Sequence, residues 1–313
     1  MKKILIYSCI FCIQVAFETN SSEIKILYKI NQNIITSHDV KEEINYLVSL
    51  NKNLNQLNRK QLASNAEQSL IREKIKKDEI EKIYNIDYSK MIESDRFKEI
   101  VSKFVKNLGF NSQTEFESYL KNRNLEIEEI KKKFLIEKFW NQLIFDKYSN
   151  TIRIDKNKIN EDFEKLTEEK SEIASFNLSE IIFFEKDKAS IEKKYQEIIS
   201  SIKQIGFNNA ATLHSISESS KLGGEIGWIN ENQISKKIFS TIKDLEVSEF
   251  SEPIVTASGI ILIRVNDKKN IKIEINKEEE IKRLVSFEKN RILNEYSIIY
   301  YKEIENKAYV KKF

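Results

Sequence analysis

Residues that break helices are concentrated in one short stretch of this sequence. The chain of 313 residues contains only 6 Gly and 1 Pro, and five of these seven are Gly223, Gly224, Gly227, Pro253 and Gly259. Because tight turns depend on Gly and Pro, so few of them argue against an all-β fold with many turns. The rest of the chain is nearly free of such residues, and this favours long helices.

The composition and charge of the chain indicate a folded protein. Hydrophobic residues make up 40% and charged residues 32% of the sequence, which is enough to bury a core. At roughly 100–200 residues per domain, we expect about two domains. The formal net charge is +3, and the two signs are mixed, as where Lys131–Lys133 follow Glu128 and Glu129. We interpret such runs as solvated helix faces and expect no nucleic-acid partner.

The N-terminus has the pattern of an export signal. Lys2 and Lys3 precede the apolar run Ile4–Phe17, and a polar stretch follows. The run is shorter than the roughly 20 apolar residues that span a bilayer. We therefore predict a signal peptide over residues 1–22. An uncleaved N-terminal anchor is the alternative, because Thr19–Ser21 is the best cleavage site and lacks a clean small-x-small pattern.

Both cysteines of the chain, Cys9 and Cys12, lie inside this N-terminal segment. The mature chain would therefore have no cysteine, which excludes disulfides, thiolate metal sites and a cysteine nucleophile. An exported protein that folds without disulfides is best placed in a bacterial periplasm. No other apolar run approaches the length of a membrane span, so we expect none after signal removal.

Between residues 23 and 168 the sequence predicts two small strands followed by helices. Residues 24–35 read as two short strands around a polar turn, and Thr36 or Ser37 then offers a hydroxyl as N-cap. Aliphatic and aromatic residues recur at helical spacing through the rest of this region, and we interpret them as core. Helices are expected over 59–86, 92–108, 126–148 and 155–166, with a short one after Ser112. We therefore expect a helical domain over 23–168.

From residue 171 the pattern changes to a compact α+β unit, expected to cover 171–269. A final long helix is predicted over 277–302 with a possible strand at 307–313, and we expect the region 276–313 to pack back on the helical domain. Within the α+β unit we expect strands at 173–184, 250–255 and 259–265, helices at 187–204, 207–214 and 232–243, and a Ser/Gly-rich loop at 215–227.

Three segments of the sequence resemble one protein family. Ile34–Val40 (IITSHDV) resembles the start of the SurA-type periplasmic chaperones. Gly223–Trp228 (GGEIGW) is similar to the Gly-Gly-x-Leu-Gly-Trp loop of the parvulin, or rotamase, domain, and Phe250–Thr256 with Gly259–Val265 resembles its closing hairpin. The resemblance implies an α+β protein. Its helical SurA-type N-terminal domain is completed by the long C-terminal helix, and one parvulin-like domain is inserted, where SurA typically has two.

The resemblance also implies where a catalytic site would lie. Parvulins catalyse rotation about X-Pro peptide bonds, whose barrier is about 18–20 kcal/mol. Active members use two histidines and a Cys or Asp, and these positions fall here at Glu180, Ser217 and Ile261. All three are substituted, and the Ile261 side chain neither donates nor accepts a hydrogen bond. Isomerase activity is therefore an open question from the sequence.

The family's proline pocket maps onto apolar residues, and we expect Ile234, Ile238, Phe239 and Trp228 to bind substrate. No cofactor and no metal site are expected. The two histidines of the chain lie at neither catalytic position. We interpret His38 as a surface residue and His214 as packed against the loop that follows it.

Three functions are compatible with these features. The leading hypothesis is a periplasmic chaperone for unfolded outer-membrane proteins, whose parvulin-like domain binds client peptide without the usual catalytic groups. The first alternative is an active isomerase with a variant site that uses Glu180, Ser217 and Ser258. The second is an assembly or interaction protein anchored to the membrane by an uncleaved N-terminus.

Overall fold

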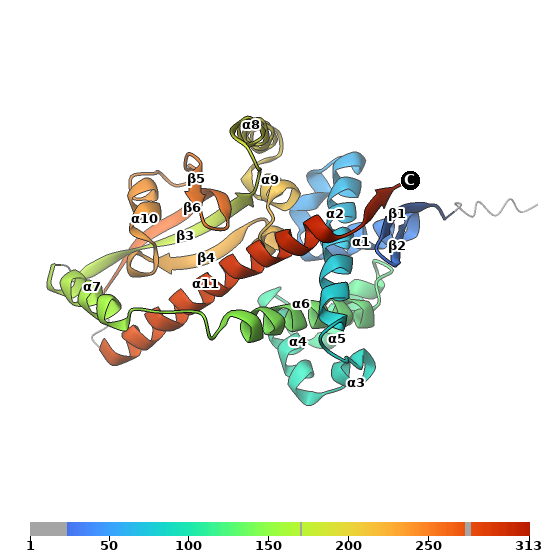
Figure 1. Cartoon of the computed structure of the whole chain (residues 1–313), viewed down its shortest axis with the longest axis horizontal. Helices are drawn as coiled ribbons and strands as arrows, with labels where there is room; N and C mark the ends of the chain where they lie inside the picture. The colour runs from blue at the N-terminus through green and yellow to red at the C-terminus, as the bar shows by residue number, and fades with distance from the viewer. Residues whose placement is uncertain (1–23, 170, 273–276) are drawn as a thin grey trace, which may run out of the picture.

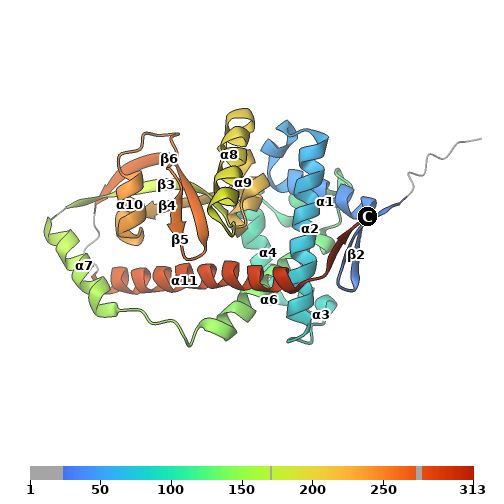
Figure 2. The same ribbon diagram turned by 45° about the horizontal axis from the view of Figure 1, so that its top comes forward.

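A computed structural model describes residues 24–169, 171–272 and 277–313 (Figure 1). The predicted signal peptide at 1–22 lies outside the described residues. The described part consists of a helical unit, an α+β unit and a long helix that runs past both (Figures 1 and 2). The expected α+β class is confirmed. None of the described helices is long and apolar enough to cross a membrane.

A small sheet joins the two ends of the described chain. Strands β1 (Ile26–Ile30) and β2 (Asn33–Thr36) form an antiparallel hairpin, and β7 (Val310–Lys312) pairs antiparallel with the other edge of β1. The strand order is therefore β2-β1-β7. The Thr36 hydroxyl then caps the first helix, accepting from the amide of Asp39. This capping fixes where the sheet ends and the helical unit begins.

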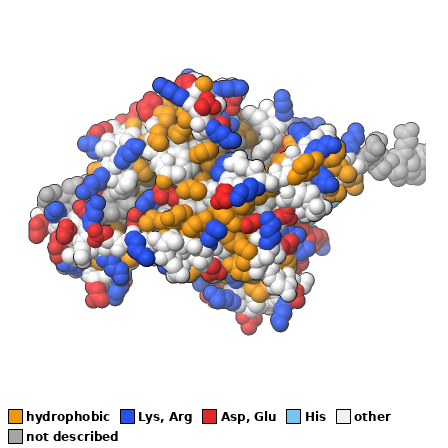
Figure 3. Space-filling view, in the orientation of Figure 1, with side chains coloured by type: hydrophobic (Ala, Val, Ile, Leu, Met, Phe, Trp, Pro, Cys, Tyr) orange, Lys and Arg blue, Asp and Glu red, His pale blue; other side chains and the backbone are white. Residues whose placement is uncertain are grey.

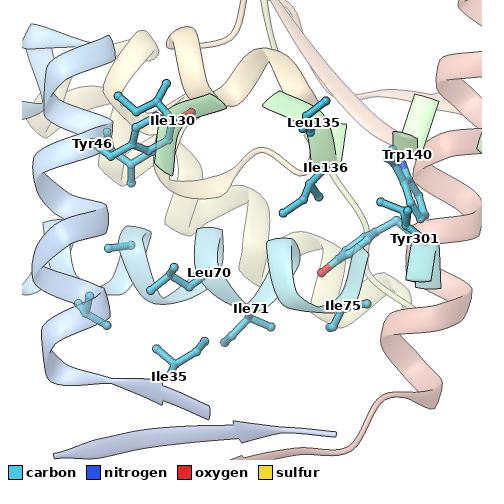
Figure 4. Close-up of a cluster of buried hydrophobic side chains, with 14 of the residues drawn as sticks. Ile35, Tyr46, Leu70, Ile71, Ile75, Ile130, Leu135, Ile136, Trp140 and Tyr301 are labelled. Atoms are coloured by element: carbon cyan, nitrogen blue, oxygen red, sulfur yellow. The ribbon is translucent and has the colours of Figure 1, made fainter. Parts of the chain in front are cut away.

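The helices of the first unit pack around one apolar core, which includes residues from the long C-terminal helix (Figure 4). Helices α2 and α6 line much of this core, with Ile71, Ile75 and Trp140 among its buried side chains. The elements are α1 (Ser37–Leu50), the 3₁₀ turn η1 (Lys52–Gln56), α2 (Arg59–Glu81), α3 (Tyr88–Ile92), α4 (Asp95–Asn107), α5 (Gln113–Lys121) and α6 (Ile127–Tyr148). The next helix, α7 (Lys156–Glu169), contributes none of the described residues of this core and packs on the long C-terminal helix instead.

The α+β unit is a four-stranded antiparallel sheet with helices on both faces. Its strand order is β4-β3-β6-β5. Two core clusters lie on opposite sides of the sheet, because successive side chains of a strand point to opposite faces. The elements are β3 (Glu172–Phe183), α8 (Lys188–Ile205), α9 (Phe207–His214), η2 (Glu218–Leu222), β4 (Glu225–Asn230), η3 (Glu231–Gln233), α10 (Lys236–Ile242), β5 (Ile254–Thr256) and β6 (Gly259–Lys272).

Strand β3 shows this alternation directly. Ile182 packs with Ile242 of α10 on one face, whereas Ile181 packs with Ile198 of α8 on the other. The first face is also contacted by Ile298 of the long helix. One face of the sheet is thus covered by α8 and α9, and the other is shared between α10 and the long C-terminal helix.

The long helix α11 (Lys277–Lys307) connects the two units. Its 31 residues extend for about 46 Å at the usual rise of an α-helix. It passes the α+β unit and then packs on the helical core (Figures 1 and 2). There the Trp140 indole donates to the Ser297 hydroxyl over 2.8 Å, and the rings of Tyr148 and Tyr296 stack at 4.4 Å. Aromatic packing therefore fixes its C-terminal half.

Several predicted element bounds were wrong. The helix predicted from residue 92 begins at Asp95, because Ser94 starts a new helix after the short α3. The loop predicted through Gly227 contains the turn η2 and the start of β4, whose residues pair with β3. In addition, α2 ends at Glu81, η3 and α10 replace one helix, and β5 covers only Ile254–Thr256. The strand predicted over 259–265 continues to Lys272, and the helix predicted over 277–302 continues to Lys307.

Candidate functional site

Two consecutive glycines hold the turn after η2 against strand β3. Gly223 and Gly224 have φ angles of +73° and +80°, in the left-handed region that favours glycine. The carbonyl of Gly224 accepts a hydrogen bond of 2.8 Å from the amide of Glu180. A Cβ atom on Gly224 would lie 2.3 Å from the carbonyl oxygen of Glu180. Only glycine therefore allows this approach, which places the η2 segment beside Glu180.

The close approach of the η2 segment to β3 brings the side chains of Glu180, Ser217 and Ser219 together. The hydroxyls of Ser217 and Ser219 both donate to Oε1 of Glu180, over 2.6 and 2.9 Å. The Ser219 hydroxyl also lies 3.0 Å from that of Ser217. Burial raises the pKa of Glu180, and the two hydroxyl hydrogen bonds oppose that shift in part. The carboxyl group is thus more easily protonated than an exposed one.

Next to this cluster the sheet presents an apolar surface. Ile261 lies opposite Ile182 on one side and opposite Ile254 on the other. Together with Ile234 and Ile238 it lines a cavity of about 440 Å³, which Glu180, Ser217 and Ser258 also line. The positions of the family's catalytic residues (Glu180, Ser217 and Ile261) therefore line one cavity. Two of the expected substrate-binding residues, Ile234 and Ile238, line it as well.

The other two expected binding residues lie elsewhere. Phe239 packs edge-on against Phe176, with ring centroids 6.2 Å apart, and is not among the residues that line this cavity. Trp228 is 42% exposed, and the Lys269 ammonium lies 4.0 Å from its ring centroid. Neither the Phe239 ring nor the Trp228 ring is therefore among the described residues that line the cavity beside Glu180.

The opposite wall of the cavity was not predicted. It comes from α2, α6 and α11, elements that are far from the sheet in the sequence. Arg72, Asn141, Phe287, Asn290, Arg291, Asn294, Ile298 and Tyr301 line it. The isoleucine surface of the α+β unit therefore faces the helical unit across the cavity. No local sequence pattern predicts this wall, because its position depends on how α11 crosses the sheet.

A cluster of charged side chains fixes the two units beside the cavity. Lys76 of α2 is only 2% exposed and forms ion pairs with Glu137 of α6 and with Glu218 of η2. Lys221 of η2 pairs with the same two carboxylates, at 2.6 and 3.2 Å. Desolvation raises the pKa of Glu218, but Lys221 and Lys76 hold it well below its ordinary value. The segment that carries Ser217 is thereby tied to the helical unit.

The two histidines lie away from the cavity. The His214 ring is held between the Ser201 hydroxyl at 2.7 Å and the Lys194 ammonium at 3.3 Å, and thus packs on α8. Burial and the charge of Lys194 lower its pKa to about 4. His38 is exposed near Glu42, with 3.5 Å between the ring and the carboxylate.

Comparison with known proteins matches the α+β unit to one family model. Residues 176–267 match the family described as "Rotamase: PPIC-type PPIASE domain". "Chaperone SurA" of Cupriavidus metallidurans is 28% identical over 79 residues, covering 25% of this chain and 16% of that protein. "Chaperone SurA" of Albidiferax ferrireducens is 27% identical over 108 residues, covering 34% and 23%. The matches span less than a quarter of these relatives, and the predicted resemblance is confirmed.

Two solved structures also match this chain, both at low sequence identity. A structure from a study of PEB4 and Cj1289, two SurA-like chaperones of Campylobacter jejuni, is 15% identical, with a TM-score of 0.35. It covers 92% of this chain and 99% of its own. A crystal structure of a PpiC-type isomerase domain is 20% identical and covers 33% of this chain and 96% of its own, with a TM-score of 0.29.

Proposed function

We propose that this SurA-like chain, with its parvulin-type domain at residues 176–267, is a periplasmic chaperone that holds unfolded outer-membrane proteins. The observation that carries the proposal is the cavity of about 440 Å³ between the isoleucine surface and helices α2, α6 and α11. Similarity to proteins named "Chaperone SurA" supports the class of function. The choice of unfolded outer-membrane proteins as clients rests on the resemblance to SurA-type chaperones alone.

The two walls suit an extended peptide of variable sequence. Ile234, Ile238 and Ile261 offer apolar surface, and burying one aliphatic or aromatic client side chain there contributes about 1.5–3 kcal/mol. The asparagines Asn290 and Asn294 on the opposite wall carry amides that can pair with a peptide backbone. Contacts of this strength, repeated along a client, favour reversible holding over tight binding of one sequence.

The same geometry argues against efficient isomerisation. A twisted prolyl amide needs positioned polar groups on the reacting atoms. Ile261 supplies none, and the hydroxyls of Ser217 and Ser219 already donate to Glu180. We therefore infer that the parvulin-type domain binds client peptide with little or no isomerase activity.

An active isomerase with a variant site is the second candidate, and one observation favours it. Glu180 lies on the cavity wall, and burial raises its pKa, so a protonated carboxyl group could donate to a prolyl carbonyl. A protease-coupled assay on an Ala-Pro peptide separates the candidates. Turnover above background that is lost in Glu180→Ala supports the isomerase, whereas the absence of turnover in the wild-type protein supports a binding domain.

The test of chaperone function is suppression of aggregation of an unfolded porin by the purified protein. We expect suppression at several-fold excess, and a wild-type protein without effect contradicts the proposal. The double variant Ile234→Asn/Ile238→Asn removes apolar surface from the cavity and should weaken suppression. Val255→Asn is the matched control, because Val255 is 65% exposed in the same domain and does not line the cavity. Equal activity of all three proteins would place client binding elsewhere.

Export and domain organisation complete the proposal. We propose a signal peptide at 1–22, a helical chaperone domain at 23–168, a parvulin-like domain at 171–269 and a C-terminal region at 276–313 that completes the helical domain. Sequencing the N-terminus of the exported protein tests the first part. A start near Ser21 or Ser22 supports a released chaperone, and an intact N-terminus supports the membrane-anchored alternative.

A further inference from the structure

The β2-β1-β7 sheet carries a concentration of exposed apolar side chains. Of the fifteen large hydrophobic residues exposed in the described chain, six lie in the segments that form this sheet, so they are gathered rather than scattered. They are Ile24, Ile26, Ile34, Tyr309, Val310 and Phe313, with exposed fractions between 43% and 64%. The buried face of the same sheet already contributes Tyr28, Ile30 and Ile35 to the helical core.

The charge of this sheet differs from that of the whole chain, where the two signs nearly balance. Residues 24–36 and 308–313 contain four lysines and no Asp or Glu. Lys312 pairs with Glu67 of α2. Lys25, Lys29 and Lys311 have no carboxylate partner among the described residues. The sheet is therefore a basic surface on a chain whose net charge is only +3.

The strand register places four of these side chains on the outward face, whereas Val310 and Lys312 lie opposite the inward-facing Ile30 and Tyr28. Lys29 lies opposite Ile34 on one side and opposite Lys311 on the other, so the three side chains share a face. The Lys311 ammonium lies 4.6 Å from the ring centroid of Phe313, which places that ring on the same side. Basic and apolar side chains also occur together at this end of the molecule in Figure 3. The outward face thus carries the two adjacent lysines Lys29 and Lys311 between the apolar side chains of Ile34 and Phe313.

We propose that the outward face of the β2-β1-β7 sheet docks on an anionic phospholipid bilayer. Lysine ammonium groups complement lipid phosphates, while short rows of apolar side chains enter the interface between head groups and acyl chains.

Other occupants fit this face less well. A second copy of the chain would bring like-charged lysines together, which is unfavourable. A client strand added to an edge would find only the four residues of β2 or the three residues of β7, and β7 carries two lysines. The anionic bilayer is the occupant that satisfies both the charge and the apolar rows.

Flotation with lipid vesicles tests the proposal, using the protein as recovered after export. We expect binding to vesicles that contain phosphatidylglycerol, weak binding to pure phosphatidylcholine, and release at high salt. Each lysine near an anionic surface strengthens binding about fivefold. The variant Lys29→Gln/Lys311→Gln should therefore bind at least about 20-fold more weakly. Ile34→Ser/Phe313→Ser should also lose binding, with charge unchanged.

The matched control is Lys103→Gln/Lys132→Gln, which removes the same charge from exposed helix positions. We expect it to bind like the wild-type protein. Equal losses of vesicle binding in the two lysine variants would show that net charge alone accounts for binding, and this would overturn the proposal. Absence of wild-type binding, or binding indifferent to lipid charge and salt, would also overturn it. A sheet variant that changes sedimentation of the protein alone would identify a contact between copies instead.

Discussion

Replacing Gly224 by alanine tests how the glycine turn positions Glu180. The left-handed conformation at this residue costs alanine about 1–2 kcal/mol. The new Cβ would also lie 2.3 Å from the Glu180 carbonyl oxygen and 2.8 Å from Cβ of Ala211. Neither atom is the end of a flexible side chain, so strand β3 and helix α9 must move, at a cost of about 1–3 kcal/mol. We expect a total loss of about 2–5 kcal/mol in the free energy of unfolding.

Gly227→Ala is the control, because it has the same backbone requirement without the contact. Gly227 has a φ of +81°, and a Cβ atom added there would have no neighbour within 4 Å. We therefore expect a loss of only about 1–2 kcal/mol. The measurement is urea unfolding followed by fluorescence in a Trp140→Phe background, where Trp228 of β4 is the remaining tryptophan and reports on this domain.

The decisive quantity is the difference in the free energy of unfolding between the two alanine variants. Equal losses of stability would show that the close approach to Glu180 contributes nothing beyond the backbone conformation. A fully stable Gly224→Ala variant would show that β3 and the η2 segment are not held together as described. In either case the cluster of Glu180, Ser217 and Ser219 would lose its structural explanation.

Three further perturbations have defined outcomes. Lys76→Ala leaves the Glu218 carboxylate with one ammonium partner fewer, and we expect urea unfolding to show a loss of about 3 kcal/mol. His214 has its pKa lowered to about 4 in the folded state, so the unfolded state binds the extra proton between about pH 6.5 and 4. Stability should fall by at most about 3 kcal/mol as pH decreases through that window, and His214→Gln should remove this component. Trp140→Phe loses the hydrogen bond to Ser297, and thermal unfolding should show a loss of about 1–2 kcal/mol.

Features determined by local sequence could be predicted well. The alternation of β3, the helical spacing of the N-terminal region and the glycines before β4 all act within a few residues. These patterns identified the parvulin-like unit and led to Glu180, Ser217 and Ile261. The close packing of these residues around one cavity follows from register and turn geometry that the family pattern already contains.

Features that depend on distant contacts could not be predicted. Strand β4 (EIGWIN) contains a glycine and directly follows a Ser/Gly-rich loop, and it is a strand because β3 offers it an edge. Lys76 lies on a helix rich in charged residues, where a solvated side chain is the ordinary expectation. In the structure its ammonium group is buried and pairs with Glu137 and Glu218. The wall formed by Asn290 and Asn294 requires α11 to cross the sheet, which no local signal encodes.

The pairing of β1 with β7 has a consequence for the order in which the protein is made. The core of the helical unit includes Tyr300 and Tyr301, and its sheet is completed by residues 310–312. A chain that emerges from its N-terminus therefore leaves an incomplete core exposed until these last segments arrive. The parvulin-type domain lies entirely between β1 and β7 and has its own core clusters, so it can fold first. Vectorial synthesis would then form the core clusters of the inserted domain before the core of the domain that encloses it, and α11 would cover the remaining face of its sheet afterwards.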